Sequence, residues 1–190
     1  MNKKIKLSLA FLATLLLIFT VSCKGNSGSD NGSSGKHHGQ ASVKDGVSAA
    51  NALQVARSIP DFSTLVAAIE AAGVQDSVVN TGPLTIFAPL NSAFAKLPKG
   101  TVETLVKPEN KKKLTFILIN HVAPANYTVA TLEKNVRKKR KLYMASGKYL
   151  EVSKKGKDLF VGGTKILKSV KVSNGWIHVI NDVLVPSNKK

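Results

Sequence analysis

Residues 84–98 read LTIFAPLNSAFAKLP, an apolar run that breaks at a proline and resumes with the spacing of a helix. The first five residues are apolar apart from one threonine, a pattern typical of a buried strand. Pro89 ends this strand, and Asn91 can cap a short helix that carries Phe94 and Leu97. The segment therefore predicts a strand that turns directly into a helix.

A second segment of this kind lies near the C-terminus, where residues 174–186 read NGWIHVINDVLVP. Asn174-Gly175 is a tight-turn pair that can launch a strand. Residues 176–180 and 183–185 have almost no polar face, so we expect two strands that are covered on both sides.

Four large side chains are expected inside the fold. Phe87 and Trp176 lie in the predicted strands, and we expect both to be buried. His178 stands between apolar neighbours, where internal hydrogen bonding is its expected role. His121 continues the apolar face of a predicted helix and is likewise expected to be structural.

The rest of the domain changes period from helical to alternating. Apolar residues recur at helical spacing from Phe62 to Ile69, with Asp61 placed to cap this helix and Gly73 to end it. A further helix is expected from Pro108 to Asn120. Alternation then predicts antiparallel strands around residues 150–152, 159–161 and 170–172. Helices first and strands later indicate an α+β domain.

The first 22 residues have the pattern of an export signal. Three lysines precede an apolar stretch from Leu7 to Val21, which is too short to span a bilayer comfortably. Residues 20–23 read TVSC and resemble a bacterial lipobox, in which the cysteine becomes the acylated N-terminus. We predict a lipoprotein signal peptide at 1–22 and lipidation of Cys23. The alternatives are an ordinary secretory signal with an incidental cysteine, or an uncleaved anchor.

The segment that follows is polar and rich in glycine. Residues 23–48 contain almost no large apolar side chain, so the lipidated cysteine and a flexible tether are predicted there. The adjacent His37 and His38 fall short of the three or four ligands of a structural metal site, and we expect no metal. From residue 49 the composition is that of a globular domain, predicted to span 49–188.

Positive charge is concentrated in the second half of the domain. The chain carries 28 Lys and Arg against 11 Asp and Glu, a net charge of +17, and 17 of these cations lie between residues 107 and 171. They include two runs, which we treat as candidate interaction sites: Lys111, Lys112, Lys113, and Arg137, Lys138, Lys139, Arg140, Lys141. The second run must face either solvent or a polyanion. The export signal disfavours an intracellular nucleic acid as the partner.

Together the two long segments resemble the fasciclin domain family. Residues 85–94 are similar to its first signature block and residues 174–186 to its second, about eighty residues further along. The resemblance implies a compact wedge of mostly antiparallel β-sheet packed with N-terminal helices. It also implies a role in adhesion or extracellular interaction without catalysis. We expect a structural role for the following motif residues: Phe87, Pro89, Asn91, Phe94, Asn174, Gly175, His178 and Asp182.

Two motifs of the family depart from their usual form here. Asn181 replaces the usual Asp after the Ile of the second block. Asn120-His121-Val122 stands where the family often has Tyr-His-Val, an element associated with integrin contact in its animal members. Asn120 and His121 are therefore candidate contact residues by resemblance, although the tyrosine is missing.

Catalysis has little support in the sequence. The motifs of serine hydrolases, phosphate-binding loops and zinc peptidases are absent, and the single cysteine is predicted to be lipidated. We expect no enzyme activity, no catalytic residue, no cofactor and no metal.

These observations predict a lipid-anchored protein of the cell envelope. In a cell with two membranes, Lys24 after the acylated cysteine favours the outer membrane, facing the periplasm or the surface; otherwise the outer face of the cell membrane is expected. The predicted function is adhesion, or interaction with an extracellular protein or matrix. The alternative is an envelope protein that binds a polyanion, such as extracellular DNA, a glycosaminoglycan or an envelope glycopolymer, through its basic second half.

Overall fold

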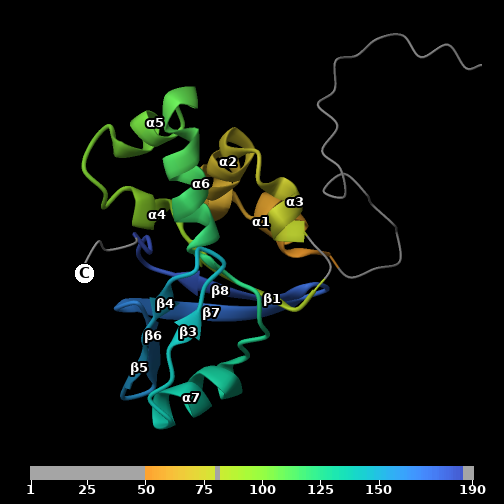
Figure 1. Ribbon diagram of the computed structural model, residues 1–190, viewed down its shortest axis with the longest axis vertical. Coiled ribbons are helices and arrows are strands. Elements are labelled where there is room, and N and C mark those ends of the chain that lie inside the picture. The colour runs from red at the N-terminus through yellow and green to blue at the C-terminus, as the bar shows by residue number, and fades with distance from the viewer. Residues whose placement is uncertain (1–49, 80–81, 186–190) are drawn as a thin grey trace, which may run out of the picture. The chain divides into compact units, whose positions relative to one another are not determined.

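The two apolar segments of the sequence form neighbouring parallel strands at the centre of the computed structural model (Figure 1). Strand β1 (Leu84–Pro89) pairs with β8 (Gly175–Ile180) in a register that runs from Leu84 opposite Gly175 to Pro89 opposite Ile180. The six-stranded sheet has the order β2-β1-β8-β7-β6-β5, and its other pairings are antiparallel. The predicted mostly antiparallel sheet is confirmed.

The structure describes residues 50–79 and 82–185, which belong to the unit Lys36–Lys190. The predicted signal peptide and tether, with Cys23, lie outside the described residues. The helices are α1 (Ala52–Ser58), α2 (Ser63–Ala72), α3 (Gln75–Val79), α4 (Asn91–Phe94), α5 (Thr101–Leu105), α6 (Lys111–Ile119) and α7 (Val129–Arg137), with 3₁₀ turns η2 (Pro60–Phe62) and η3 (Pro108–Asn110). The remaining strands are β2 (Val122–Ala123), β3 (Leu142–Tyr143), β4 (Tyr149–Leu150), β5 (Val152–Lys155), β6 (Asp158–Val161) and β7 (Thr164–Val172).

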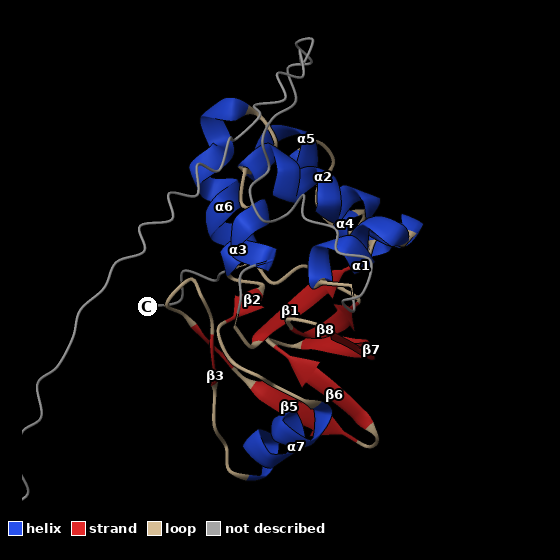
Figure 2. Ribbon diagram, turned by 90° about the vertical axis from the view of Figure 1, so that its right-hand side faces the viewer, coloured by secondary structure: helices blue, strands red, loops and turns tan. Residues whose placement is uncertain are grey.

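Helices cover both faces of the sheet. Helices α1 to α6 gather on one side, and α7 lies on the other (Figures 1 and 2). Because successive residues of a strand point to opposite faces, Ile86 and Ala88 of β1 join the core under α1, α2 and α6, whereas Phe87 joins a second core with Leu132 of α7. The predicted α+β fold with N-terminal helices on a sheet is confirmed, and α7 is an addition that the periodicity analysis missed.

The corner after β1 leads into the predicted short helix, but Asn91 caps a different helix from the one predicted. Asn91 is the first residue of α4, and its Oδ1 accepts a hydrogen bond from the Thr64 amide at 3.0 Å, in the first turn of α2. Asn91 therefore caps α2 rather than its own helix, and Asp61, predicted to cap α2, lies exposed in η2. Gly73 ends α2 as predicted, with φ 68.

Other expected elements are shorter or divided. The helix predicted from residue 108 begins as the η3 turn and becomes α-helical only at Lys111. The strand expected at 150–152 is divided at Glu151, whose carbonyl accepts from the Gly162 amide at 2.8 Å, so β4 pairs with β3 and β5 pairs with β6. The strands at 159–161 and 170–172 are confirmed as β6 and part of β7.

Two predictions about the second apolar segment are wrong. Residues 183–185 do not form a strand, because side chains rather than a neighbouring backbone bind the amide and carbonyl of Leu184. Trp176 is half-buried rather than buried, since it lies near the beginning of β8. Phe87, by contrast, is fully buried, as predicted.

Candidate functional site

Asn120 and His121 hold the C-terminal end of the described chain. The Asn120 Nδ2 donates to the Leu184 carbonyl at 3.0 Å, and the Leu184 amide donates to His121 Nε2 at 2.9 Å. The Ser146 hydroxyl donates to Asn120 Oδ1 at 2.7 Å. The two side chains satisfy both backbone groups of Leu184, as a neighbouring strand would. We call this arrangement the Leu184 latch.

The latch contains a buried, neutral imidazole. His121 is 3% exposed, and its Nδ1 donates to the Ile117 carbonyl at 2.9 Å, which leaves Nε2 as the acceptor for Leu184. Burial lowers the pKa of His121 to about 4. Asn120 is 1% exposed, so neither side chain lies on the surface of the domain. Both ring nitrogens of His121 are thus hydrogen-bonded inside the domain.

Acid should loosen the latch. The folded-state pKa of His121 lies near 4 and its unfolded value near 6.5, so the unfolded chain binds more protons between these pH values. We expect the free energy of unfolding to be highest above pH 6.5 and to fall by on the order of 3 kcal/mol by pH 4 through this residue. Urea titrations across this pH range measure the effect, with His121→Gln as the control. Equal slopes of stability against pH in both chains would contradict this assignment.

His178 has a second internal hydrogen-bond network. Its Nε2 donates to the Tyr127 carbonyl at 2.7 Å, and Nδ1 accepts from the Ser169 hydroxyl at 2.7 Å. The imidazole stacks on Phe87 with ring centroids 5.4 Å apart. Burial lowers the pKa of His178, which favours the neutral ring. Both ring nitrogens of His178 are thus hydrogen-bonded inside the domain.

Other motif residues also make contacts inside the domain. Asn174 Oδ1 accepts from the Ala52 amide and its Nδ2 donates to the Val78 carbonyl, each at 3.0 Å, so one side chain holds α1 and α3 against β8. Asp182 Oδ1 accepts from the amide of the next residue at 2.9 Å. Pro89 is buried at the end of β1, and Phe94 packs against the helical core.

The described residues offer no arrangement for metal chemistry. Within residues 50–79 and 82–185, no group of three His, Cys, Asp or Glu side chains is placed to hold a metal ion. In the same part of the chain, no helix combines the length and apolar character needed to cross a membrane.

The basic segment Arg137–Lys141 lies at the C-terminal end of α7. All five side chains are exposed, and Lys139 adopts φ 50, a left-handed conformation more usual for glycine. Cations are favoured at this end of a helix because its free carbonyls carry partial negative charge. Lys141 pairs with Glu151 at 3.3 Å, so the segment has one carboxylate partner that its sequence neighbourhood did not reveal.

Carboxylates near the basic segment are already paired. Lys154 lies 2.6 Å from Glu133, where its hydrogen bond lowers the pKa of that carboxyl, and Lys165 lies 2.6 Å from Asp158. Apart from these lysines and Lys141, the cations between residues 134 and 171 have no ion pair among the described residues. The second half therefore presents an excess of positive charge at its surface.

The other basic run divides between two faces of α6. Lys111, Lys112 and Lys113 form the first turn of the helix and are exposed. Lys113 lines an apolar cavity, whereas Lys111 and Lys112 line a separate, open depression with Pro108 and Glu109.

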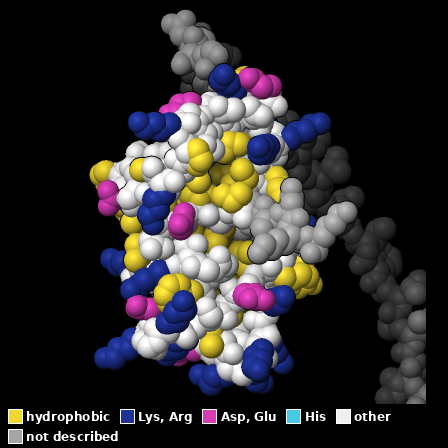
Figure 3. Space-filling model, turned by 90° about the vertical axis from the view of Figure 1, so that its left-hand side faces the viewer, with side chains coloured by type: hydrophobic (Ala, Val, Ile, Leu, Met, Phe, Trp, Pro, Cys, Tyr) yellow, Lys and Arg dark blue, Asp and Glu magenta, His cyan; other side chains and the backbone are white. Residues whose placement is uncertain are grey.

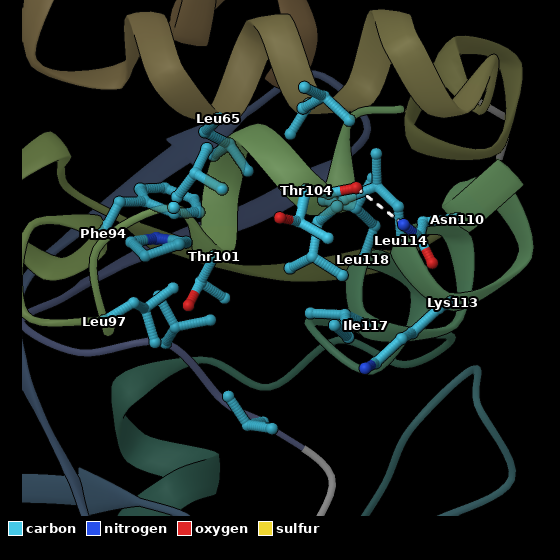
Figure 4. Close-up of a pocket in the computed structure, with 18 of the residues that line it drawn as sticks. Leu65, Phe94, Leu97, Thr101, Thr104, Asn110, Lys113, Leu114, Ile117 and Leu118 are labelled. Atoms are coloured by element: carbon cyan, nitrogen blue, oxygen red, sulfur yellow. Dashed lines mark hydrogen bonds between the residues drawn. The ribbon is translucent and has the colours of Figure 1, made fainter. Parts of the chain in front are cut away.

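The apolar cavity lies among α2, α4, α5 and α6 and has a volume of about 420 Å³. Figure 3 shows apolar side chains gathered in a hollow on this side of the molecule, and Figure 4 shows the lining residues. Leu65, Phe94 and Leu118 form part of its wall. We call it the helical cavity. The sequence analysis missed it, because the same apolar spacing that signals a packed helix also lines a space between helices.

Comparisons with known proteins agree with this fold. The profile of the fasciclin domain family matches residues 60–186. Protein sll1483 of Synechocystis sp. is 43% identical over 140 residues, which cover 73% of this chain and 75% of that protein. The transforming growth factor-beta-induced protein ig-h3 of Sus scrofa is 36% identical over 130 residues, covering 68% of this chain and 18% of that protein. A FAS1 domain pair from the insect cell adhesion molecule Fasciclin I superposes with a TM-score of 0.56 at 22% identity, covering 72% of this chain and 51% of that chain.

Proposed function

Because this chain belongs to the fasciclin domain family, we propose that it is an adhesion or extracellular-interaction module held at the cell envelope by an acyl group on Cys23. The observation that carries the proposal is the use of the family's motif residues. The polar side-chain atoms of three motif residues form hydrogen bonds inside the domain: His121, His178 and Asn174. This internal use supports the proposal that the domain is a scaffold that recognises partners through other residues on its surface. The fold also resembles about half of a FAS1 domain pair from an insect cell adhesion molecule, since the match covers 51% of that chain.

Membrane anchoring is the first part of this proposal. Cys23→Ala should abolish incorporation of a labelled fatty acid and release the chain from the membrane fraction, because the variant removes the acylated residue that anchors it. Fractionation of cells grown with the label measures both effects, and Ser22→Ala, which keeps a small residue before the cysteine, is the matched control. Loss of label with continued membrane sedimentation would show that another element anchors the chain.

Exposure to the outside is the second part. A partner outside the cell must reach the domain, so protease added to intact cells should remove it while a periplasmic marker stays intact. Survival of the domain until the cells are lysed would contradict an outward-facing position and restrict its partners to the envelope interior.

A second candidate function is polyanion binding by the basic segment. The observation that favours it is the excess of unpaired cations around α7 and the β5–β6 hairpin, given above. An anionic polymer would release counterions on binding, and affinity would fall steeply with salt.

Neutralising Arg137, Lys138 and Arg140 to Gln should weaken binding to heparin and flatten its salt dependence. Each lost contact should reduce the slope of log affinity against log salt by about one, while the melting temperature stays nearly constant because exposed charges contribute little to folding. A matched control carries Lys107→Gln, Lys111→Gln and Lys112→Gln. If the slope of log affinity against log salt is equal for the wild type and the triple variant at Arg137, Lys138 and Arg140, the basic segment is only a solvated surface.

A further inference from the structure

The helical cavity has the size of a small-molecule site. Its volume of about 420 Å³ lies within the range of roughly 300–1,000 Å³ that such sites occupy. The deep wall is formed by Leu65, Leu114 and Leu118, which are buried residues of the helical core. A ligand in the cavity would therefore rest directly on the core of the domain.

The outer wall of the cavity is loosely packed. Helix α5, which forms one side, contains no buried residue, and its Leu105 is only half-buried. Val106 and Val185 also line the cavity and are 38% and 56% exposed. Apolar side chains left open to water around a hollow indicate a place where an apolar group can bind.

The charged groups of the cavity are all cations. Its lining includes Lys99 and Lys113 and contains neither Asp nor Glu. Neither lysine has an ion pair among the described residues. Lys113 also follows two further lysines in the first turn of α6, where neighbouring positive charges raise the local potential. Figure 4 shows the Lys113 side chain extending beside Ile117.

From this combination we infer that the helical cavity binds a single-chain fatty acid, with its acyl chain on the leucine wall and its carboxylate beside Lys113 and Lys99. The apolar lining favours binding of the acyl chain of the ligand. The two lysines, with no acidic residue in the lining, favour a negatively charged head group. An uncharged chain would leave both lysines without a partner. A protein segment rich in acidic residues would match the charge but not the depth of the apolar wall.

Calorimetry with sodium hexadecanoate tests the inference, and hexadecanol serves as the uncharged ligand of equal chain length. The full chain is used with Cys23→Ser, so that no acyl group of its own competes for the cavity. We expect hexadecanoate to bind more tightly than hexadecanol. Lys113→Gln should weaken hexadecanoate binding about tenfold, as expected for loss of one charge-assisted contact, and leave hexadecanol binding unchanged.

Two further variants separate the head-group contact from the cavity itself. Lys112→Gln removes a neighbouring charge that does not line the cavity, so it should weaken hexadecanoate binding much less than Lys113→Gln does and leave hexadecanol binding unchanged. Leu97→Trp places a larger side chain in the cavity and should weaken both ligands, with thermal unfolding to verify that the variant is folded. The inference is overturned if neither ligand binds, if Lys112→Gln acts as strongly as Lys113→Gln, or if folded Leu97→Trp binds hexadecanoate as the parent chain does.

Discussion

Replacement of Gly175 by alanine is expected to cost at least about 3 kcal/mol of the free energy of unfolding, a large share of the roughly 5–15 kcal/mol typical of a domain. Gly175 begins β8 with φ 143, a conformation that side chains rarely adopt. A methyl group there would overlap the backbone carbonyl of Leu84, the residue opposite it on β1. Because Leu84 is itself held by a hydrogen bond from its amide to the Asn174 carbonyl at 2.9 Å, the two central strands cannot separate without losing their pairing.

Gly163→Ala is the matched control for this effect. Gly163 has φ 83 and open space where the methyl group would stand, so its substitution carries only backbone strain, about 1–2 kcal/mol. Urea denaturation of both variants separates strain from the contact between strands. Similar midpoints for Gly175→Ala and Gly163→Ala would show that the close approach of β1 and β8 is unimportant.

Phe87→Ala is expected to cost about 3–5 kcal/mol. Phe87 is 0% exposed, packs in the core beneath α7 and stacks on His178, so its removal leaves a cavity that the surrounding side chains cannot fill. The denaturant midpoint should fall with little change in the slope of the transition. An unmoved midpoint would mean that the first signature block does not lie at the centre of the fold.

Trp176→Ala provides an internal comparison for Phe87→Ala. Trp176 is half-buried, and its ring lies 6.4 Å from that of His178 between centroids. Only the covered part of the side chain loses apolar contact, so we expect a cost of about 1–2 kcal/mol. A larger loss for Trp176→Ala than for Phe87→Ala would contradict the burial that the structure shows.

The central strands could be predicted from sequence, but their pairing could not. The apolar run before Pro89 and the run after Gly175 each indicate a buried strand by composition alone. That they lie parallel depends on the path of the intervening chain, which local patterns do not report. Asn91 shows the same limit, since its residue type signals a helix cap while the helix that it caps lies 27 residues earlier.

The apolar pattern of the sequence also does not show where side chains, rather than a neighbouring strand, bind the backbone. The spacing of residues 183–185 matches a strand, yet the hydrogen bonds of Leu184 go to Asn120 and His121, more than 60 residues away. The exposure of the basic segment was predictable, because five consecutive cations cannot be buried together. The ion pair of Lys141 with Glu151 was not predictable, because the pairing of β3 with β4 brings these two residues together.

Attachment of intact cells to a matrix-coated surface under flow tests the proposed adhesion function most directly. Three otherwise identical strains are compared: one with the wild-type chain, one with Cys23→Ala at equal abundance, and one without the chain. The account predicts that the wild-type strain is retained severalfold better than the other two, which behave alike because the released domain no longer joins the cell to the surface. Equal retention of all three strains, with the wild-type domain accessible to protease on intact cells, would contradict it.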